Sequence, residues 1–229
     1  MSLFAIADLH LSLGTDKPMD IFGGWNNYTE RLSENWNKLV TDDDTVLIAG
    51  DISWAMKLNE CEKDFSFINS LPGNKIFLKG NHDYWWDTLS KINRYLDEHS
   101  FDKIKILFNN SYEVEEYVLC GTRGWSLDCE TDEDIRILNR ECGRLRFSLD
   151  SAKECGKEPI VFLHYPPIYG DNVCDSIIEI LKEYNVKKCY YGHIHGSKMI
   201  RGSFNGQYEG IKFKLVSCDA VSFTPVLVR

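Results

Sequence analysis

The sequence predicts an α/β protein, and three observations support this. Short apolar runs that end in a polar residue read as buried strands, and segments with a helical pattern lie between most of them. The C-terminal third differs, because it is rich in strand-forming residues and has little helical pattern. Strands that alternate with helices pair in parallel through crossover connections. We therefore expect a parallel sheet, and antiparallel or mixed C-terminal strands that complete a second sheet.

Five predicted strands each lead into a carboxylate, an amide or an imidazole. They are LFAIAD up to Asp8, TVLIAGD up to Asp51, KIFLKGNHD up to Asp83, PIVFLHYPP through His164 and KKCYYGHIHG up to His195. In sheets of this class, ligands bind beyond the carboxyl ends of the strands. The polar residues at these five ends are therefore expected to lie together.

Helices are predicted where apolar residues recur at intervals of three and four. Segments 135–149 and 173–184 show this pattern clearly, and 29–40 and 84–98 show it less regularly. The last segment, GIKFKLVSCDAVSFTPVLVR at 210–229, is expected to complete the second sheet. The irregular segment 14–27 precedes a helix and is expected at the rim of the site, as a lid that sets specificity or as a surface connection.

Length and composition favour a single soluble domain over residues 1–229. A formal net charge of −9 argues against nucleic acid and anionic membranes as partners, because both attract concentrated basic residues. Cys120, Cys189 and Cys218 lie in apolar strand-like runs, and no two cysteines have C-x-x-C spacing. Because we also find no signal peptide or long apolar segment, we expect reduced thiols and a cytoplasmic protein.

Metal binding explains the strand ends better than separate structural roles do. Any one block alone is more simply a turn, but the set supplies the carboxylate, imidazole and amide donors that suit manganese, iron or zinc. Five of the six histidines belong to it, and only His99 does not. Glycines 50, 80 and 192 precede the donors, where they permit unusual torsions and close approach. The candidate residues are Asp8, His10, Asp51, Asn81, His82, Asp83, His164, His193 and His195.

The ordered blocks D-x-H, G-D, G-N-H-D, H and G-H-x-H, from Asp8 to His195, resemble the calcineurin-like metallophosphoesterase superfamily, and its small bacterial-type members in particular. The resemblance implies a four-layer α/β/β/α sandwich of two mixed sheets flanked by helices. It also implies two divalent metal ions, manganese or iron with zinc as the alternative. One ion would be held by Asp8, His10, Asp51 and His195, and the other by Asp51, Asn81, His164 and His193.

The same resemblance implies a role for each part of the site. Asp51 would bridge the two ions, and a hydroxide between them would attack the phosphorus in line. His82 would not be a ligand but would stabilise or protonate the leaving group. Asp83 would fix the orientation of the loop or of an imidazole.

The implied activity is that of a metal-dependent phosphoric ester hydrolase with a small phosphorylated substrate. The segment GDISWAMK at 50–57 lacks the arginine that the protein-phosphatase branch has after G-D, so small phosphodiesters are favoured over phosphoproteins as substrates. A nuclease ranks lower, because the chain is short and acidic. A phosphomonoesterase and a non-catalytic metal-binding scaffold are the alternatives. Oligomeric state is left open by the sequence.

Three aromatic or basic positions near these blocks have simpler structural interpretations. At least one of Trp85 and Trp86 is expected to pack the following helix onto the sheet, although stacking on a nucleobase is the alternative. Arg123 could grip a phosphate, but a surface salt bridge is the favoured role.

Overall fold

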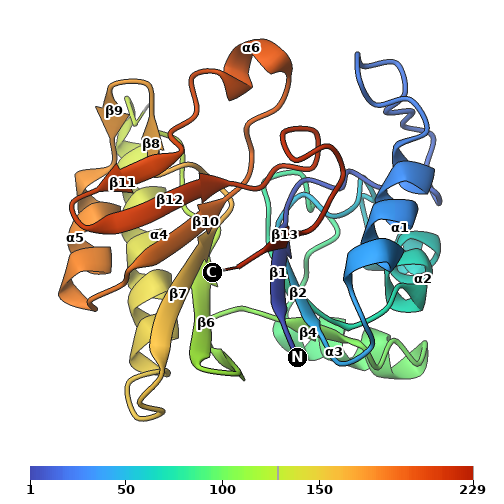
Figure 1. The fold of residues 1–229 in the computed structure, drawn as a ribbon, viewed down its shortest axis with the longest axis horizontal. Helices are drawn as coiled ribbons and strands as arrows, with labels where there is room; N and C mark the ends of the chain where they lie inside the picture. Colours follow the sequence, from blue (N-terminus) through green and yellow to red (C-terminus); the bar gives the residue numbers. More distant parts are fainter. Residues whose placement is uncertain (128, 229) are drawn as a thin grey trace.

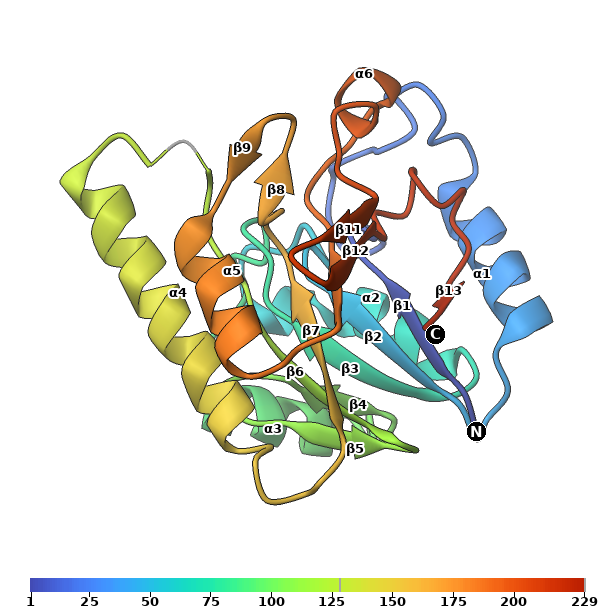
Figure 2. The same cartoon turned by 60° about the vertical axis from the view of Figure 1, so that its left-hand side comes forward.

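Two large sheets lie face to face, and helices cover the outer side of each, as the two views of the computed structural model show (Figure 1, Figure 2). The structure describes residues 1–127 and 129–228. Both large sheets are mixed, because each contains parallel and antiparallel pairs. This arrangement is the four-layer α/β/β/α sandwich that the motif resemblance implied.

The first sheet has the strand order β13-β1-β2-β3-β4. Its parallel strands are β1 (Leu3–Ile6), β2 (Thr45–Ala49), β3 (Asn74–Leu78) and β4 (Ile104–Ile106), and β13 (Val226–Leu227) pairs antiparallel with β1. Its helices are α1 (Tyr28–Leu39), α2 (Glu62–Ser70) and α3 (Leu89–Glu98), and the 3-10 turn η1 (Leu58–Glu60) precedes α2. Buried residues of all three helices form one apolar cluster with this sheet.

The second sheet has the order β11-β12-β10-β7-β6-β5. Its parallel strands are β6 (Tyr117–Thr122), β7 (Glu158–Leu163), β10 (Lys188–Tyr191) and β12 (Ile211–Leu215), and antiparallel β5 (Tyr112–Val114) and β11 (Gly206–Tyr208) form the edges. Helices α4 (Asp132–Asp150) and α5 (Asp175–Glu183) cover its outer face. The hairpin of β8 (Ile168–Tyr169) and β9 (Asn172–Val173) and the short α6 (Ser197–Ile200) lie outside this sheet.

Successive side chains of the central strands contribute to two different cores. In β2, Val46 and Ile48 point to the helices, whereas Leu47 and Ala49 point to the opposite sheet. Because a strand buried on both faces needs apolar residues at every position, these strands appear in the sequence as continuous apolar runs rather than alternating ones.

The predicted helices are largely confirmed, and the differences have local causes. Helix α3 begins at Leu89 rather than near residue 84, because the preceding residues form a turn in which Trp85 donates to Asp83. Trp85 is buried against Phe65 of α2, in the same apolar cluster as Ile92 of α3 and Phe77 of β3, which agrees with the expectation that at least one of Trp85 and Trp86 packs α3 onto the sheet. Helix α2 was not predicted, because only Phe65, Phe67 and Ile68 are apolar among its residues and they do not give a clear helical pattern.

The C-terminal segment divides between the two sheets. Strand β12 completes the second sheet as expected, but β13 returns to the first sheet and pairs with β1. The expectation that the whole segment belongs to the second sheet was therefore wrong. The buried thiols of Cys120, Cys189 and Cys218 agree with the interpretation of these cysteines as core residues. Over the described ranges, the structure contains no helix long and apolar enough to cross a bilayer.

We propose that residues 1–229 form one domain, because the apolar layer between the sheets is shared and the last strand belongs to the first sheet. Metal-free protein should then unfold in denaturant as one cooperative transition. Tryptophan fluorescence mainly reports the first half of the chain, which holds five of the six tryptophans, whereas far-ultraviolet circular dichroism reports helices of both halves. The two signals should give one midpoint, and two separate midpoints would contradict the proposal.

Candidate metal centre

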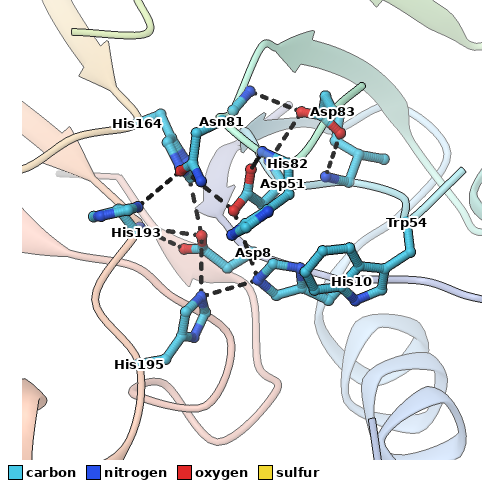
Figure 3. A network of polar contacts seen from close by, with 12 residues as sticks. Asp8, His10, Asp51, Trp54, Asn81, His82, Asp83, His164, His193 and His195 are labelled. Atoms are coloured by element: carbon cyan, nitrogen blue, oxygen red, sulfur yellow. Dashed lines mark hydrogen bonds and ion pairs between the residues drawn. The ribbon is translucent and has the colours of Figure 1, made fainter. Parts of the chain in front are cut away.

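The polar residues predicted at the five strand ends lie together at the junction of the two sheets (Figure 3). Asp8 and His10 follow β1, Asp51 follows β2, and Asn81 follows β3, all in the first sheet. The second sheet supplies the rest, since His164 follows β7 and His193 and His195 follow β10. The site is therefore built across both sheets rather than within either.

One group of donor atoms consists of Asp8, His10 and His195, whose ligand atoms all lie within 4.8 Å of one another. The two Nε2 atoms of His10 and His195 are 3.1 Å apart. Asp8 Oδ1 lies 3.3 Å from His195 Nε2. Asp8 and His10 are buried, and His195 is partly exposed.

A second group consists of Asp51, His164 and His193, also within 4.8 Å of one another. The amide oxygen of Asn81 joins it, at 2.6 Å from His164 Nε2 and 2.9 Å from His193 Nδ1. His164 Nδ1 contacts the carbonyl oxygen of Ala49 at 3.0 Å, which assigns its proton to Nδ1 and leaves the Nε2 lone pair toward the donor group.

Asp51 lies between the two groups. Its Oδ2 atom is 3.5 Å from His164 Nε2 and 3.7 Å from His10 Nε2. The other oxygen, Oδ1, accepts a hydrogen bond from the backbone N–H of His82 at 2.8 Å, which fixes the carboxylate plane. One carboxylate oxygen is thus within reach of both donor groups.

Left-handed backbone torsions turn several of these side chains inward. Asp8, His10, Asp51 and His193 have φ of 62°, 45°, 51° and 72°. Such torsions in residues other than glycine cost on the order of 1–3 kcal/mol each and cluster at functional sites. Because strand torsions would continue the alternation of the sheet, these turns bring successive ligands to a common centre.

All three predicted glycines are needed for close approach. A Cβ atom at Gly80 would lie 2.1 Å from Asp51 Oδ1, and one at Gly192 would lie 2.5 Å from Asp8 Oδ2. A Cβ atom at Gly50 would lie 2.6 Å from His164 Nδ1, and Gly50 also has a φ of 92°, which is the unusual torsion that the sequence suggested.

Burial and charge set the protonation of the metal-free site. Burial lowers the pKa of the His193 ring to about 3 and lowers the pKa values of the His10 and His164 rings, so all three are neutral at pH 7. Burial raises the pKa of the Asp51 carboxyl to about 8, and the charge of Asp8 adds to this. Burial opposes protonation of His195, but the carboxylates of Asp8 and Asp219 outweigh it and raise its pKa to about 10.

The donor set fits divalent metal ions. Lone pairs converge here from imidazole nitrogens, an amide oxygen and two buried carboxylates. The ring nitrogens of His10 and His195 lie at hydrogen-bond distance, so in the metal-free site one of them must carry the proton between them. Cations would satisfy these lone pairs and neutralise the carboxylates. A bound cation would displace the proton that the carboxylates of Asp8 and Asp219 hold on His195.

Asp83 orders the loops rather than the donors. Its buried carboxylate accepts hydrogen bonds from the backbone N–H groups of Gly80, Asp51 and Ile52 at 2.7–3.0 Å, and from the indole of Trp85 at 3.0 Å. It therefore joins the loop after β2 to the loop after β3. The sequence left two roles open for Asp83, orientation of the loop or orientation of an imidazole, and these contacts correspond to orientation of the loop.

His82 faces the site from beside the donor groups. Its ring centroid lies 5.7 Å from that of His10 and 4.6 Å from that of Trp54, and Trp54 stacks on His10 at 4.8 Å. The ring Nδ1 atom is 3.3 Å from the hydroxyl of Tyr84. The side chain is partly exposed, so it can reach a ligand.

Sequence reasoning missed Asp219, which orients a candidate ligand. Its Oδ1 atom is 3.2 Å from His195 Nδ1, and its Oδ2 accepts the backbone N–H of Gly196 at 2.8 Å. A carboxylate behind an imidazole fixes the ring and makes its other nitrogen a better donor. The signal was present, because Asp219 follows the apolar run KLVSC as the other acids follow theirs.

Arg123 forms the ion pair that the sequence favoured, but the pair is not on the surface. Its guanidinium lies 3.6 Å from Glu141, and the two side chains are 17% and 0% exposed. The carbonyl oxygen of Arg123 also accepts the backbone N–H groups of His164 and Tyr165. The residue thus supports the end of β7 through its main chain.

Two clefts flank the donor groups. One, of about 380 Å³, opens beside His10, His82 and His195. The other, of about 160 Å³, opens beside His193 and is lined by Tyr165 among others. The predicted position of segment 14–27 at the rim is confirmed by Phe22 and Gly23, which line the larger cleft.

Solved structures share the fold at low sequence identity. A protein of unknown function from Aquifex aeolicus aligns with a TM-score of 0.57 and 18% identity over 99% of this chain and 95% of that one. A phosphopantetheinyl hydrolase from Mycobacterium tuberculosis aligns with a TM-score of 0.59 and 15% identity, covering 94% and 88%. A Thermus thermophilus protein aligns with a TM-score of 0.58 and 10% identity, covering 99% and 97%.

Sequence comparisons identify the family. An uncharacterized protein of Methanocaldococcus jannaschii is 32% identical over 62 residues, which make up 27% of this chain and 34% of that relative. The match therefore spans about a third of that relative's length. The profile of the calcineurin-like phosphoesterases matches residues 1–197, which include all the strand-end donors. The chain therefore belongs to the calcineurin-like phosphoesterase family.

Proposed function

We propose that this phosphoesterase hydrolyses small phosphodiesters with two bound divalent metal ions, manganese or iron, with zinc as the alternative. The position of Asp51 is the observation that carries the proposal. Its Oδ2 atom is within 3.7 Å of ring nitrogens in both donor groups, as a carboxylate that bridges two ions requires. Each group has further donors of its own, so neither depends on Asp51 alone.

The residues divide into two ligand sets. Asp8, His10, Asp51 and His195 would hold one ion, and Asp51, Asn81, His164 and His193 would hold the other. When bound, such ions supply positive charge for the phosphate oxygens and lower the pKa of water. Asn81 provides an oxygen without a negative charge, which keeps the site attractive to an anionic ester.

His82 is placed to act on the leaving oxygen. It lies next to His10 without belonging to either donor group, and it is accessible from the larger cleft. Burial lowers the pKa of its ring, and the negative charge of a bound ester acts in the opposite direction. A hydrogen bond or proton from this ring would stabilise the charge that develops as the ester bond breaks.

The two clefts favour a diester over a monoester. A phosphodiester carries two organic groups, and one cleft opens next to His10 and His195 while the other opens next to His193. A monoester would use only one of them. Phosphomonoesterase activity and a non-catalytic scaffold are the alternatives, and the position of His82 favours catalysis because metal binding alone does not need it.

The Asp51→Asn variant tests the bridging role. It should reduce bound manganese from about two ions per chain to one or none, because the amide cannot supply a charged bridge. The Asp83→Asn variant should keep its metal and lose activity by about 10–100-fold, since it alters loop orientation only. Elemental analysis measures the metal, and Asp87→Asn is the control, because Asp87 is an exposed carboxylate in the same loop as Asp83. Normal metal content in Asp51→Asn would refute the bridge.

The His82→Asn variant separates a catalyst from a scaffold. Turnover should fall by about 10²–10⁴-fold with metal content unchanged, because the variant lacks an acid but leaves every ligand in place. His99→Asn, at the end of α3 and outside the site, should behave as the parent protein does. Unchanged turnover in His82→Asn would remove this residue from the mechanism.

The choice between diester and monoester is tested with two substrates that share a leaving group. Manganese-loaded protein should turn over bis(para-nitrophenyl) phosphate with a higher kcat/KM than para-nitrophenyl phosphate, because only the diester uses both clefts. Release of para-nitrophenol is followed by absorbance, and chelator-treated protein is the control. A higher kcat/KM for the monoester would favour the phosphatase alternative.

A further inference from the structure

We propose that the cleft beside His82 binds a flat, apolar leaving group, so that the preferred esters are those of aromatic or similarly planar alcohols. This inference rests on the proposed function and adds the class of alcohol that is released. Three properties of the cleft support it: the side of the donor groups on which the cleft lies, the side chains that form the wall of the cleft, and the volume of the cleft.

The position of the cleft assigns it to the leaving group. His82 is the residue placed to act on the leaving oxygen, and its ring forms part of this cleft together with His10 and His195. Hydrolysis breaks the bond from phosphorus to that oxygen, joins a water oxygen to phosphorus, and leaves the water proton on the departing alcohol. The organic group of that alcohol must therefore lie on the His82 side, within this cleft.

The wall beyond the histidines is apolar and aromatic. It consists of Met19, Phe22, Trp25 and Trp54, and among the residues that the structure describes no acidic or basic side chain lines it apart from the imidazoles. Trp54 already donates its indole N–H to the sulfur of Met19 at 3.2 Å. The wall thus offers rings and a thioether rather than hydrogen bonds, which suits a ring that is bound by stacking and burial.

The aromatic wall is held rigidly near the donor groups and is open at its rim. Trp25 is buried and packs against His195 with ring centroids 5.8 Å apart, and Trp54 stacks on His10. Phe22 is 52% exposed at the rim. An exposed phenyl ring is ordinary by itself, but this one borders a cleft that leads to the reacting centre, where a bound ring would cover it.

The size of the cleft fits a small organic group. Its volume of about 380 Å³ is at the lower end of the range of small-molecule sites. Among the described residues, one cation contacts Trp54 in the wall of this cleft. It is Lys17, whose Nζ lies 4.8 Å from the centre of the indole ring. A ligand with a second phosphate in this cleft would have only that amine to compensate its charge, so a neutral group is favoured.

The test uses phosphonates, because their carbon–phosphorus bond is not hydrolysed and binding is read without turnover. Calorimetry with manganese-loaded protein should show that benzylphosphonate binds about 10-fold or more tightly than methylphosphonate, since only the benzyl group fills the cleft. Phe22→Ala should reduce this ratio about threefold or more and leave methylphosphonate binding unchanged. Ile21→Ala is the matched control, because Ile21 is the adjacent residue, is 72% exposed and does not line the cleft.

Each outcome decides a different claim. A ratio near one in the parent protein, or a ratio that Phe22→Ala leaves intact, would overturn the leaving-group inference while the proposed function stands. Failure of both phosphonates to bind would overturn the proposed function and, with it, the inference. A high ratio that falls in Phe22→Ala and persists in Ile21→Ala would support both.

Discussion

The burial of two carboxylates at one point is the constraint on which the rest of the site depends. Asp8 and Asp51 are 0% and 1% exposed, and like charges so close together in a protein interior are costly unless they are compensated. In the metal-free protein, a proton on Asp51 and a proton on His195, next to Asp8, provide that compensation. Divalent cations would provide it more fully, and this is why imidazole lone pairs surround the two acids.

The sandwich architecture makes this arrangement possible. Two sheets that pack face to face bring the carboxyl ends of their parallel strands to one junction, where neither sheet alone could supply enough ligands. The approach is close enough that Gly80 and Gly192 have no room for a side chain beside Asp51 and Asp8. Asp83 then holds two of the converging loops through their backbone N–H groups, so these loops are oriented by hydrogen bonds outside the proposed ligand sets.

The strands and their polar ends could be predicted from the sequence, because buried parallel strands are continuous apolar runs and ligands follow them directly. Other features depend on contacts between distant segments. The pairing of β13 with β1 has no local signal, and the carbonyl of Ala49 behind His164 is a main-chain group that no residue type reveals. Asp219 was visible as an acid after an apolar run, but only the fold shows that it faces His195. The aromatic wall of the larger cleft likewise combines Phe22 and Trp54, which are far apart in the sequence.

The division of each proposed ligand set between the two sheets has a consequence for the order in which the site can form during synthesis. Asp8, His10, Asp51 and Asn81 are synthesised first, but His193 and His195 follow more than a hundred residues later. An emerging N-terminal half would present incomplete ligand sets and the bare inner face of the first sheet, including Leu47 and Ile76. Neither proposed ligand set would therefore be complete until His193 and His195 have been synthesised, and until then the apolar inner face of the first sheet lacks the second sheet that covers it.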